Sequence, residues 1–434
     1  MNADDLKGKR LLYLGGIPRA RYVVQRAREL GIYVIVADYN ENSPAKCVAN
    51  EGVLVDALDV DALIAIGCEK HIDGIMTGYS DILLPICSAV ANKLGLPCYM
   101  TDDMIRFTTD KGYFKNSCNE YGVPVPKQYE VDENDLMSSA LKLTYPVFIK
   151  PMDASGSRGA SACYNRLEFE KKFFFAKAAS KSGRVSVEEC LTGVAFILDY
   201  ALVDGRAYLL SMADCYASDG RPAAVNSPNL MILPSKNIRR YLAKIDCVVR
   251  DFFAGKNYNN GIFFFQGYAT DDMITFYEAG CRLGGTWPYV DQFFYKINPL
   301  DMLFRYALTG SMLAEENPDV MTGLYDGYAA IIYFISNKPS GKISAIKGVD
   351  VVGNLSYVVN LMQYYFVDDT FDLVKSRITD VRFMAVHLVA KNYNELVKRI
   401  NFVYSQIDFV GSDGTSLLAP VYDIKNLSGY EMEG

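Results

Sequence analysis

The sequence predicts an α/β domain followed by α+β regions, and three observations lead to this fold class. Residues 10–100 alternate short apolar runs with amphipathic helical segments, which indicates β-α-β units in a parallel, doubly wound sheet. Residues 106–305 and 306–434 instead mix strand-like and helical segments. The chain has 434 residues, and domains of ~150 residues each would divide it into three.

The composition is that of a packed globular protein, and it excludes several classes of function. Half of the residues are hydrophobic and 22% are charged. The net charge of -7 argues against a nucleic-acid partner, because phosphate backbones require clustered Lys and Arg. No run of about 18 apolar residues occurs, so we expect no contact with a membrane. The first residues lack the layout of a signal peptide, and we therefore expect a cytoplasmic protein.

Histidine and cysteine usage narrows the chemistry further. The two histidines, His71 and His387, exclude a histidine-rich zinc site and argue against a Ser-His-Asp triad. Ten cysteines are scattered from Cys47 to Cys281 without a CxxC pair, which is typical of small buried apolar side chains. Any catalysis must therefore rely on carboxylates, amides, lysines, arginines and bound ions.

The first domain contains one turn that invites a cofactor interpretation. The strand at 10–14 ends in Gly15-Gly16, a helix follows between Pro18 and Gly31, and the next strand ends at Asp38. The turn does not have the GxGxxG pattern of dinucleotide-binding sites, so a tight turn without a cofactor is favoured. Two roles are open for Asp38: it could hold a ribose, or it could simply end a strand.

A lysine and a loop of small residues form the most informative segment. An apolar run ends at Lys150, and the loop 153–159 contains Ser155, Gly156 and Ser157. Backbone N–H groups in such a loop can approach an anion closely, and the lysine adds a positive charge, so the segment suits a polyphosphate. No GxxxxGK[ST] motif occurs, which excludes a P-loop. The alternative is a flexible hairpin with an incidental lysine.

A second pattern indicates a metal site. Gln266 and Glu278 each close an apolar run, and a turn separates the two runs. Two adjacent antiparallel strands would bring both side chains to one face of a sheet. A carboxylate oxygen and an amide oxygen are reasonable ligands for Mg²⁺. Arg282 follows Glu278 by four residues in a glycine-rich stretch.

These segments, in this order, resemble the ATP-grasp superfamily, and most closely its biotin carboxylase and carbamoyl phosphate synthase large-subunit branch with the related amino-acid ligases. The resemblance covers nearly the whole chain. It implies a Rossmann-like domain at 1–105, an ATP-grasp nucleotide-binding domain at 106–305 and a C-terminal α+β domain at 306–434. It also implies ATP and Mg²⁺ as cofactors, and a small-molecule carboxylate and amine as substrates that are joined through an acyl phosphate. A homodimer would fit this architecture.

The resemblance assigns roles to the matching positions. Lys111 in DKGYFK and Lys150 match the lysines that contact the ATP phosphates, and 153–159 matches the mobile loop that closes over them. Glu278 matches the main metal-bridging carboxylate, and Arg282 matches an arginine that steadies phosphate or the acyl phosphate. The remaining positions match the adenine site, with Glu188 near the amino group and the hinge backbone supplied by Glu189, Cys190 and Leu191.

The chain departs from the family pattern at the metal site. Gln266 stands where such ligases usually have Glu or Asp, and Gly280 stands where E-x-N-x-R has its asparagine. After the hinge, Gly193-Val194-Ala195 replaces the frequent G-x-E, which leaves the usual ribose-binding carboxylate unassigned. Fewer anionic ligands should weaken Mg²⁺ binding, although the ATP phosphates can supply ligands.

Two other functions are therefore open. One is an inactive ATP-binding regulatory protein that has kept the fold, and the other is a biotin carboxylase-like enzyme. The second would need a partner protein, because the chain has no biotin-accepting MKM motif. Candidates for the acceptor pocket are Arg282, Trp287, Asp214 and Tyr216, although core packing is an equally good role for Trp287.

Overall fold

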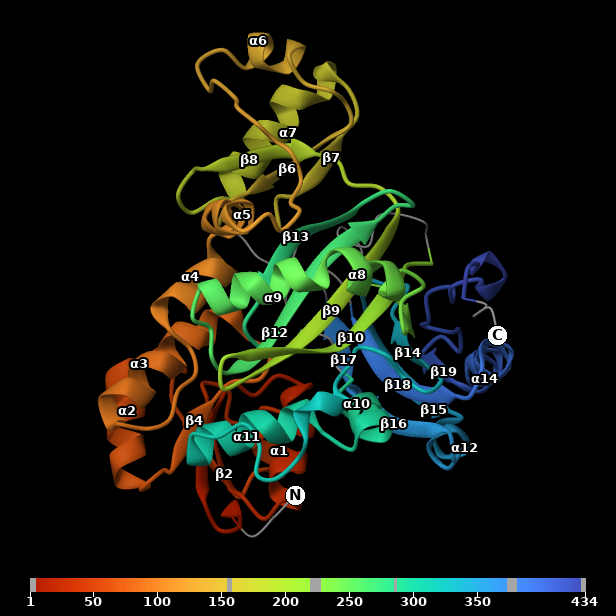
Figure 1. The fold of residues 1–434 in the computed structure, drawn as a ribbon. Coiled ribbons are helices and arrows are strands. Elements are labelled where there is room, and N and C mark those ends of the chain that lie inside the picture. The colour runs from red at the N-terminus through yellow and green to blue at the C-terminus, as the bar shows by residue number, and fades with distance from the viewer. Residues whose placement is uncertain (1–4, 154–157, 219–227, 285–286, 373–380, 431–434) are drawn as a thin grey trace.

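The computed structural model describes residues 5–153, 158–218, 228–284, 287–372 and 381–430 (Figure 1). The first domain is a four-stranded sheet in the order β3-β2-β1-β4, and all of its pairings are parallel. This confirms the expected α/β class. Its strands are β1 (Arg10–Leu14), β2 (Tyr33–Asp38), β3 (Glu51–Leu54) and β4 (Gly74–Met76), and its helices are α1 (Ala20–Glu29), α2 (Val60–Glu69) and α3 (Leu84–Leu94).

Two short helices, α4 (Asp102–Thr109) and α5 (Lys111–Glu120), lead out of this domain. The sequence predicts a single helix from 106 that ends near Gly122. That prediction is wrong, because the helix is interrupted at Asp110. Asp110 ends α4 and caps α5, because its carboxylate accepts hydrogen bonds from the backbone N–H groups of Gly112 and Tyr113. The break places Lys111 at the first turn of α5.

A small antiparallel sheet follows in the order β5-β8-β6-β7, with two helices packed against it. Figure 1 shows this unit projecting from one end of the molecule, away from the first domain. Its core is formed by apolar side chains such as Val147, Ile149 and Phe173. The elements are β5 (Gln128–Tyr129), α6 (Leu136–Leu141), β6 (Val147–Pro151), β7 (Ser161–Cys163), α7 (Arg166–Ala179) and β8 (Val185–Glu189).

An eight-stranded antiparallel sheet is the centre of the molecule, in the order β13-β12-β9-β10-β11-β14-β18-β16. Its strands are β9 (Val194–Val203), β10 (Arg206–Tyr216), β11 (Leu230–Leu233), β12 (Gly261–Ala269), β13 (Ile274–Gly280), β14 (Tyr328–Ile335), β16 (Val358–Gln363) and β18 (Arg382–Ala390). The sheet continues past residue 305, where the sequence places a domain boundary. The region after 305 therefore completes the central sheet.

The two faces of the central sheet are covered by different parts of the chain. Helices α8 (Ile238–Lys244) and α9 (Asp246–Gly255) pack with α4 and α5 on one face. The other face, called the inner face below, packs against α1 and against α10 (Pro288–Tyr295) and α11 (Pro299–Thr309). A three-stranded sheet of β15 (Ser340–Lys347), β17 (Thr370–Asp372) and β19 (Asp408–Gly411) lies beside α12 (Val349–Gly353) and α14 (Tyr393–Gln406).

Local signals in the sequence explain several helix starts. Side-chain oxygens at the N-caps accept hydrogen bonds from backbone N–H groups that would otherwise lack partners, at Asp59, Thr101, Asp110, Asn165, Asn298 and Asn392. Within the described ranges, no helix has the length and apolar character needed to cross a bilayer.

Candidate functional site

A buried glutamate between two lysines lies where the small sheet meets α5. Glu188 on β8 forms ion pairs with Lys115 on α5 and with Lys150 on β6, the latter at 2.5 Å between Nζ and Oε1. Strand pairing explains part of this arrangement, because Lys150 is the register partner of Ser186, two residues before Glu188. All three charged side chains are buried, with Lys115 3%, Lys150 5% and Glu188 2% exposed.

The opposite charges in this cluster stabilise each other's ionised forms. Burial alone would raise the pKa of Glu188, but Lys150 and Lys115 lower it, so the carboxylate is ionised. Burial lowers the pKa of Lys115, and the negative charge of Glu188 opposes that shift. The cluster holds two cations for one anion, and the excess positive charge suits a polyphosphate.

Lys111 joins this cluster to the metal-site candidate. Burial lowers the pKa of Lys111, while the nearby charges of Glu278 and Glu188 raise it and that of Lys150 lowers it further. These interactions place Lys111 within electrostatic range of β13, β8 and β6 together. The charge of Lys111 is therefore coupled to those of Lys150 and of the predicted metal ligand Glu278.

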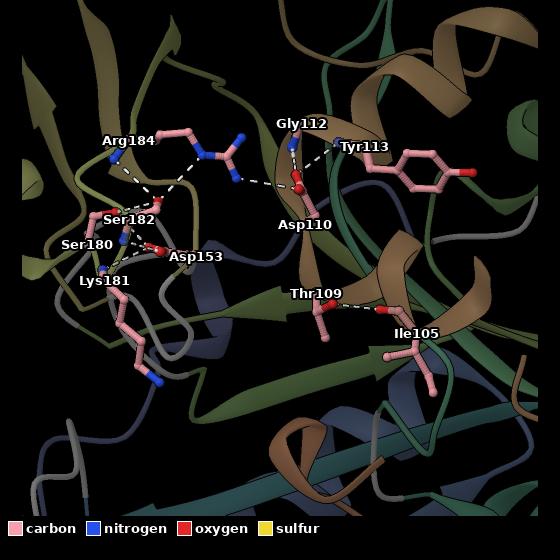
Figure 2. A network of polar contacts seen from close by, with 10 residues as sticks. All are labelled: Ile105, Thr109, Asp110, Gly112, Tyr113, Asp153, Ser180, Lys181, Ser182 and Arg184. Carbon is pink, nitrogen blue, oxygen red and sulfur yellow. Dashed lines mark hydrogen bonds and ion pairs between the residues drawn. The ribbon is translucent and has the colours of Figure 1, made fainter. Parts of the chain in front are cut away.

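Figure 2 shows the polar network beside this place, at the base of the loop that follows β6. Asp153 accepts hydrogen bonds from the hydroxyl of Ser180 at 2.7 Å and from the backbone N–H of Ser182 at 2.7 Å. Burial raises its pKa, but these hydrogen bonds outweigh it and lower the pKa to about 2. Arg184 donates to Asp110 at 3.4 Å and so connects the start of α5 to the same turn. The predicted loop residues Ser155, Gly156 and Ser157 lie outside the described residues.

Gln266 and Glu278 are register partners on β12 and β13, as the sequence predicts. Gln266 is also the register partner of Ile197 on β9, whose side chain packs in the inner-face core. Opposed residues in an antiparallel pair share a face, so Gln266 and Glu278 both belong to the inner face. The hydroxyl of Tyr277 donates to Oε1 of Gln266 at 3.3 Å, and Lys150 Nζ lies 5.8 Å from the centre of the Tyr277 ring.

Comparison with known proteins matches part of the chain to a family with an ATP-binding domain. Residues 110–211 match the family described as carbamoyl-phosphate synthase L chain, ATP binding domain. The chain is 29% identical over 196 residues to formate-dependent phosphoribosylglycinamide formyltransferase of Methanocaldococcus jannaschii, a match that covers 42% of this chain and 48% of that protein. The enzyme of the same name from Methanococcus vannielii is 26% identical over 282 residues, or 63% of this chain and 70% of that protein. The chain thus spans about half the length of the first of these relatives.

Solved structures match over almost the entire chain. L-amino acid ligase from Bacillus licheniformis superposes with a TM-score of 0.72 at 17% identity, over 94% of this chain and 99% of the ligase. The biotin carboxylase domain of Hydrogenobacter thermophilus 2-oxoglutarate carboxylase, a dimer in complex with MgADP and bicarbonate, gives 0.74 at 17% identity over 93% and 91%. Both are ATP-grasp proteins. The chain has the ATP-grasp fold.

The segment that the resemblance assigns to the adenine hinge follows directly from β8. The backbone N–H of Glu189 donates to Lys127 O at 2.9 Å, and that of Cys190 donates to Pro146 O at 3.3 Å. These two N–H groups therefore hold the hinge to the protein itself. Leu191 packs against the inner-face core. Sequence reasoning assigned Glu188 to the adenine amino group, whereas the structure gives its carboxylate two lysine partners.

A steric contact explains why no side chain stands at position 280, where the resemblance predicts an asparagine. A Cβ atom at Gly280 would lie 2.1 Å from the Phe264 ring, and one at Gly284 would lie 2.2 Å from the same side chain. Phe264 is the register partner of Gly280, two residues before Gln266 on β12. The aromatic ring therefore fills the space that a side chain at position 280 would occupy.

Arg282 connects the ATP-grasp sheet to the first domain. Its guanidinium forms a bidentate ion pair with Asp81, at 2.6 Å from Nε to Oδ1 and 2.6 Å from Nη2 to Oδ2. It also lies over the Phe264 ring, 5.0 Å from the ring centre. The contact of Arg282 with phosphate stays a prediction. The pair with Asp81 sets the position from which the guanidinium would have to reach a phosphate.

Four other candidate residues have structural roles. Trp287 is 1% exposed and donates to Ser211 Oγ at 2.7 Å, so it is a core residue. Asp214 and Tyr216 alternate on β10 with Ala213 and Cys215, which face the inner core, so they lie on the opposite face from Gln266. Asp38 accepts from the backbone N–H of Gly16 at 2.7 Å, which supports the tight-turn interpretation.

Sequence reasoning missed two residues of this site. Lys115 lies one helical turn after Lys111 in DKGYFK, and this spacing was the available signal. Tyr277 precedes Glu278 and would normally point to the other face of its strand. A register shift after Gln266 lets its hydroxyl reach the amide, and bulges of this kind are not visible in a sequence.

Proposed function

We propose that the protein is an ATP- and Mg²⁺-dependent ligase that joins a carboxylate to an amine through an acyl phosphate and releases ADP. The buried cluster of Lys115, Glu188 and Lys150 carries this proposal. Tyr277 contacts both Lys150 and Gln266, the strand partner of Glu278, so cations for a polyphosphate lie beside a carboxylate for its metal ion. The names of similar proteins agree with it, since L-amino acid ligase, phosphoribosylglycinamide synthetase and a formate-dependent formyltransferase are among them.

The inner-face pair of Gln266 and Glu278 fits a magnesium ion that is shared with ATP. Mg²⁺ is usually held by one or two carboxylates together with substrate phosphates and water. One carboxylate and one amide oxygen lie together here, and the described residues contain no group of three acidic, His or Cys ligands. Bound magnesium would neutralise phosphate charge and help to orient the transferred group.

The reaction that we propose has two steps. A carboxylate oxygen bonds to the γ-phosphorus of ATP while the bond to the β–γ bridging oxygen breaks, which releases ADP. The amine nitrogen then bonds to the acyl carbon, inorganic phosphate leaves, and the nitrogen loses its proton to solvent or phosphate. Lys111 and Lys150 would stabilise the phosphate charge in the first step, because phosphoryl transfer demands mainly positioning and charge neutralisation.

Release of ADP tests this function. Purified protein with Mg-ATP is supplied with pairs of carboxylates and amines, and with bicarbonate and free biotin as a separate pair. We expect ADP and an amide product from at least one carboxylate–amine pair, and a fall of roughly 100-fold in kcat for Lys150→Gln. The exposed Lys142 on the same unit provides the control variant Lys142→Gln, which should keep full activity.

Two results would contradict the ligase. ADP release only with bicarbonate and biotin would indicate a carboxylase. Nucleotide binding without turnover for any pair would indicate an ATP-binding protein that has lost catalysis, an alternative favoured by Gln266 at a position that usually carries an acid. Titration of the Gln266→Glu variant with Mg²⁺ then distinguishes a weakened metal site from an absent one. The biotin carboxylase domain named above is a dimer, and a homodimer and a cytoplasmic location remain expectations for this chain.

A further inference from the structure

A β-bulge in the β12–β13 hairpin brings an extra side chain to the proposed metal pair. Gln266 is the register partner of Glu278, and the register shifts directly after it, so that Tyr277 has no register partner. Two residues of β13 therefore oppose one residue of β12. The residues on either side of these two, Phe276 and Ala279, pack in the core of the opposite face, whereas Tyr277 packs against the inner-face core. The bulge thus places Tyr277 and Glu278 side by side on the inner face.

The residue after Gln266 explains why the bulge forms at this position. A Cβ atom at Gly267 would lie 2.3 Å from the backbone oxygen of Thr275 and 2.4 Å from the Phe196 ring. Only glycine lets the two strands approach this closely, and the extra residue on the facing strand increases the local twist. The sequence therefore favours a bulge at the position where it turns the Tyr277 side chain toward Gln266.

Tyr277 contacts both the metal pair and the phosphate lysine. Its hydroxyl donates to Oε1 of Gln266 at 3.3 Å, and the Nζ atom of Lys150 lies 5.8 Å from the centre of its ring. The Tyr268 ring packs against it, with 5.8 Å between the ring centres and 40° between the ring planes. These contacts hold the half-buried ring in place, so its hydroxyl acts on the amide from a fixed position.

An amide needs this contact more than a carboxylate would. The side chain of Gln266 ends in an oxygen and an NH₂ group, and only the oxygen can bind a cation. Without the contact, a half-turn of the amide would present the NH₂ group to the metal ion. The two oxygens of a carboxylate are equivalent, so the same half-turn would change nothing. The charge of Lys150 over the Tyr277 ring draws electron density from the hydroxyl, which favours donation to the amide oxygen over acceptance from the NH₂ group.

We propose that Tyr277 is a positioning residue for the metal ion, because its hydroxyl holds the Gln266 amide with the oxygen, and not the NH₂ group, available beside Glu278. The inference rests on the proposed ligase function. In this arrangement Oε1 accepts the hydroxyl proton with one lone pair and offers the other to Mg²⁺. The neutral amide then serves as a ligand at a position where the resemblance predicts an acid, and the metal pair carries one negative charge instead of two.

The gain in nucleotide affinity that Mg²⁺ provides tests the proposal. Calorimetry on the full chain measures the dissociation constant of adenylyl imidodiphosphate, a non-hydrolysable ATP analogue, in EDTA and in excess Mg²⁺. The ratio of the first constant to the second reports how well the protein holds the metal ion. Tyr277→Phe keeps the ring contacts with Lys150 and Tyr268 and removes only the hydroxyl. It should reduce the ratio about threefold to tenfold, as expected for one hydrogen bond, and should leave the constant in EDTA unchanged.

A double-mutant cycle separates amide positioning from packing. Gln266→Glu should raise the ratio, since it adds a charged oxygen ligand. In that background Tyr277→Phe should change the ratio less than about twofold, because either oxygen of the carboxylate can bind the metal ion. The matched control is Tyr208→Phe, which removes a hydroxyl from the inner-face core opposite Ala201 of β9, whereas Gln266 lies opposite Ile197 of the same strand. This control should keep the parent ratio, and thermal unfolding confirms that each variant is folded.

Three results would overturn the inference. They are an unchanged ratio in Tyr277→Phe, a loss of the same size in the Gln266→Glu background, and a ratio near one in the parent protein. The ratio is measured without turnover, so failure of the proposed function is a separate result. A protein that shows the expected cycle but releases no ADP with any carboxylate–amine pair would contradict the ligase and support the role of Tyr277. Absence of analogue binding in both conditions would contradict both.

Discussion

Asp291, at the first turn of α10, is a carboxyl group that the fold keeps away from water. It is 2% exposed, and its Oδ1 lies 2.6 Å from the hydroxyl of Tyr325. Burial raises its pKa to about 8, although the hydrogen bond from Tyr325 opposes the rise. The folded protein therefore carries a protonated Asp291 near pH 7, whereas the unfolded chain carries an ionised one.

This difference predicts a pH dependence of stability with a definite sign. Between the ordinary pKa of 3.8 and about 8, only the folded state holds the proton, so the free energy of unfolding falls as the pH rises. Asp291→Asn removes the titration and should flatten that part of the curve. At about 1.4 kcal/mol per pH unit, the gap between 3.8 and about 8 limits the effect to roughly 6 kcal/mol.

Urea unfolding at pH 5 and pH 8 measures the effect. Asp291→Asn should lose less stability than the parent protein between the two pH values, while Asp251→Asn, at an exposed position of α9, should follow the parent. Equal pH slopes for the parent and Asp291→Asn would show that Asp291 is already ionised in the folded protein.

At the residue scale, the sequence indicated which charged side chains belong to the candidate site, but not which side chains they contact. Lys111, Lys150 and Glu278 could be selected because their segments, taken in order, resemble the ATP-grasp pattern. The pairing of Glu188 with Lys115 could not, because it joins a strand to a helix that lies 73 residues away in the chain. Contacts of this kind depend on how two elements dock, and sequence spacing does not contain that information.

At the scale of elements, the β12–β13 hairpin holds the proposed metal pair and was well predicted. Its two apolar runs and the turn between them indicated antiparallel strands, and the structure pairs Gln266 with Glu278. The break at Asp110 was not predicted, because a helix pattern continues through it. The large sheet also extends past residue 305, since β14 and β18 join it across a long sequence separation.

The same hairpin predicts the cost of restoring a side chain at position 280. Gly280→Ala would place a Cβ atom 2.1 Å from the Phe264 ring, and the ring must move. Forced repacking of this kind typically destabilises a protein by ~1–3 kcal/mol. Gly280→Asn should therefore fail to add a metal ligand unless Phe264 is also replaced by a smaller residue. Urea unfolding of Gly280→Ala, Phe264→Leu and the double variant measures the coupling between the two positions.

We expect the double variant to be more stable than the sum of the single effects predicts. Gly353→Ala on α12 is the matched control, because a Cβ atom there meets only Leu361 at 3.9 Å. This control should be neutral or slightly stabilising, since alanine favours a helix over glycine. Additive effects at positions 264 and 280 would contradict the steric explanation.

At the scale of the whole molecule, the first domain is held to the rest of the chain by polar contacts as well as by the shared core. Arg282 pairs with Asp81, and the hydroxyl of Tyr99 donates to Cys281 O at 2.9 Å. The metal-motif segment after β13 is thereby fixed against the first domain.

The contact between α1 and α11 is the most deeply buried of these polar links, and it yields a prediction for the docking itself. Arg26 forms two hydrogen bonds with Asp301, at 2.9 and 2.7 Å, and Asp301 is 1% exposed. Arg26→Gln would leave a buried carboxyl group without its cation. Loss of one partner of a buried pair typically costs ~3–5 kcal/mol. Because part of the Arg26 side chain is exposed, we expect a loss near the lower limit, about 3 kcal/mol.

Hydrogen exchange shows whether this loss acts on the docking of the first domain. In Arg26→Gln, amides of β1, β2 and β4 should exchange faster, while those of β9 and β10 should change less. Arg28→Gln lies on the same helix, where Arg28 is exposed and donates to Val48 O, and it should leave exchange almost unchanged. Uniformly faster exchange throughout the protein would mean that the first domain and the central sheet unfold as one unit. In that case the Arg26–Asp301 pair would contribute to the global stability of the protein, and it would not control the docking of the first domain by itself.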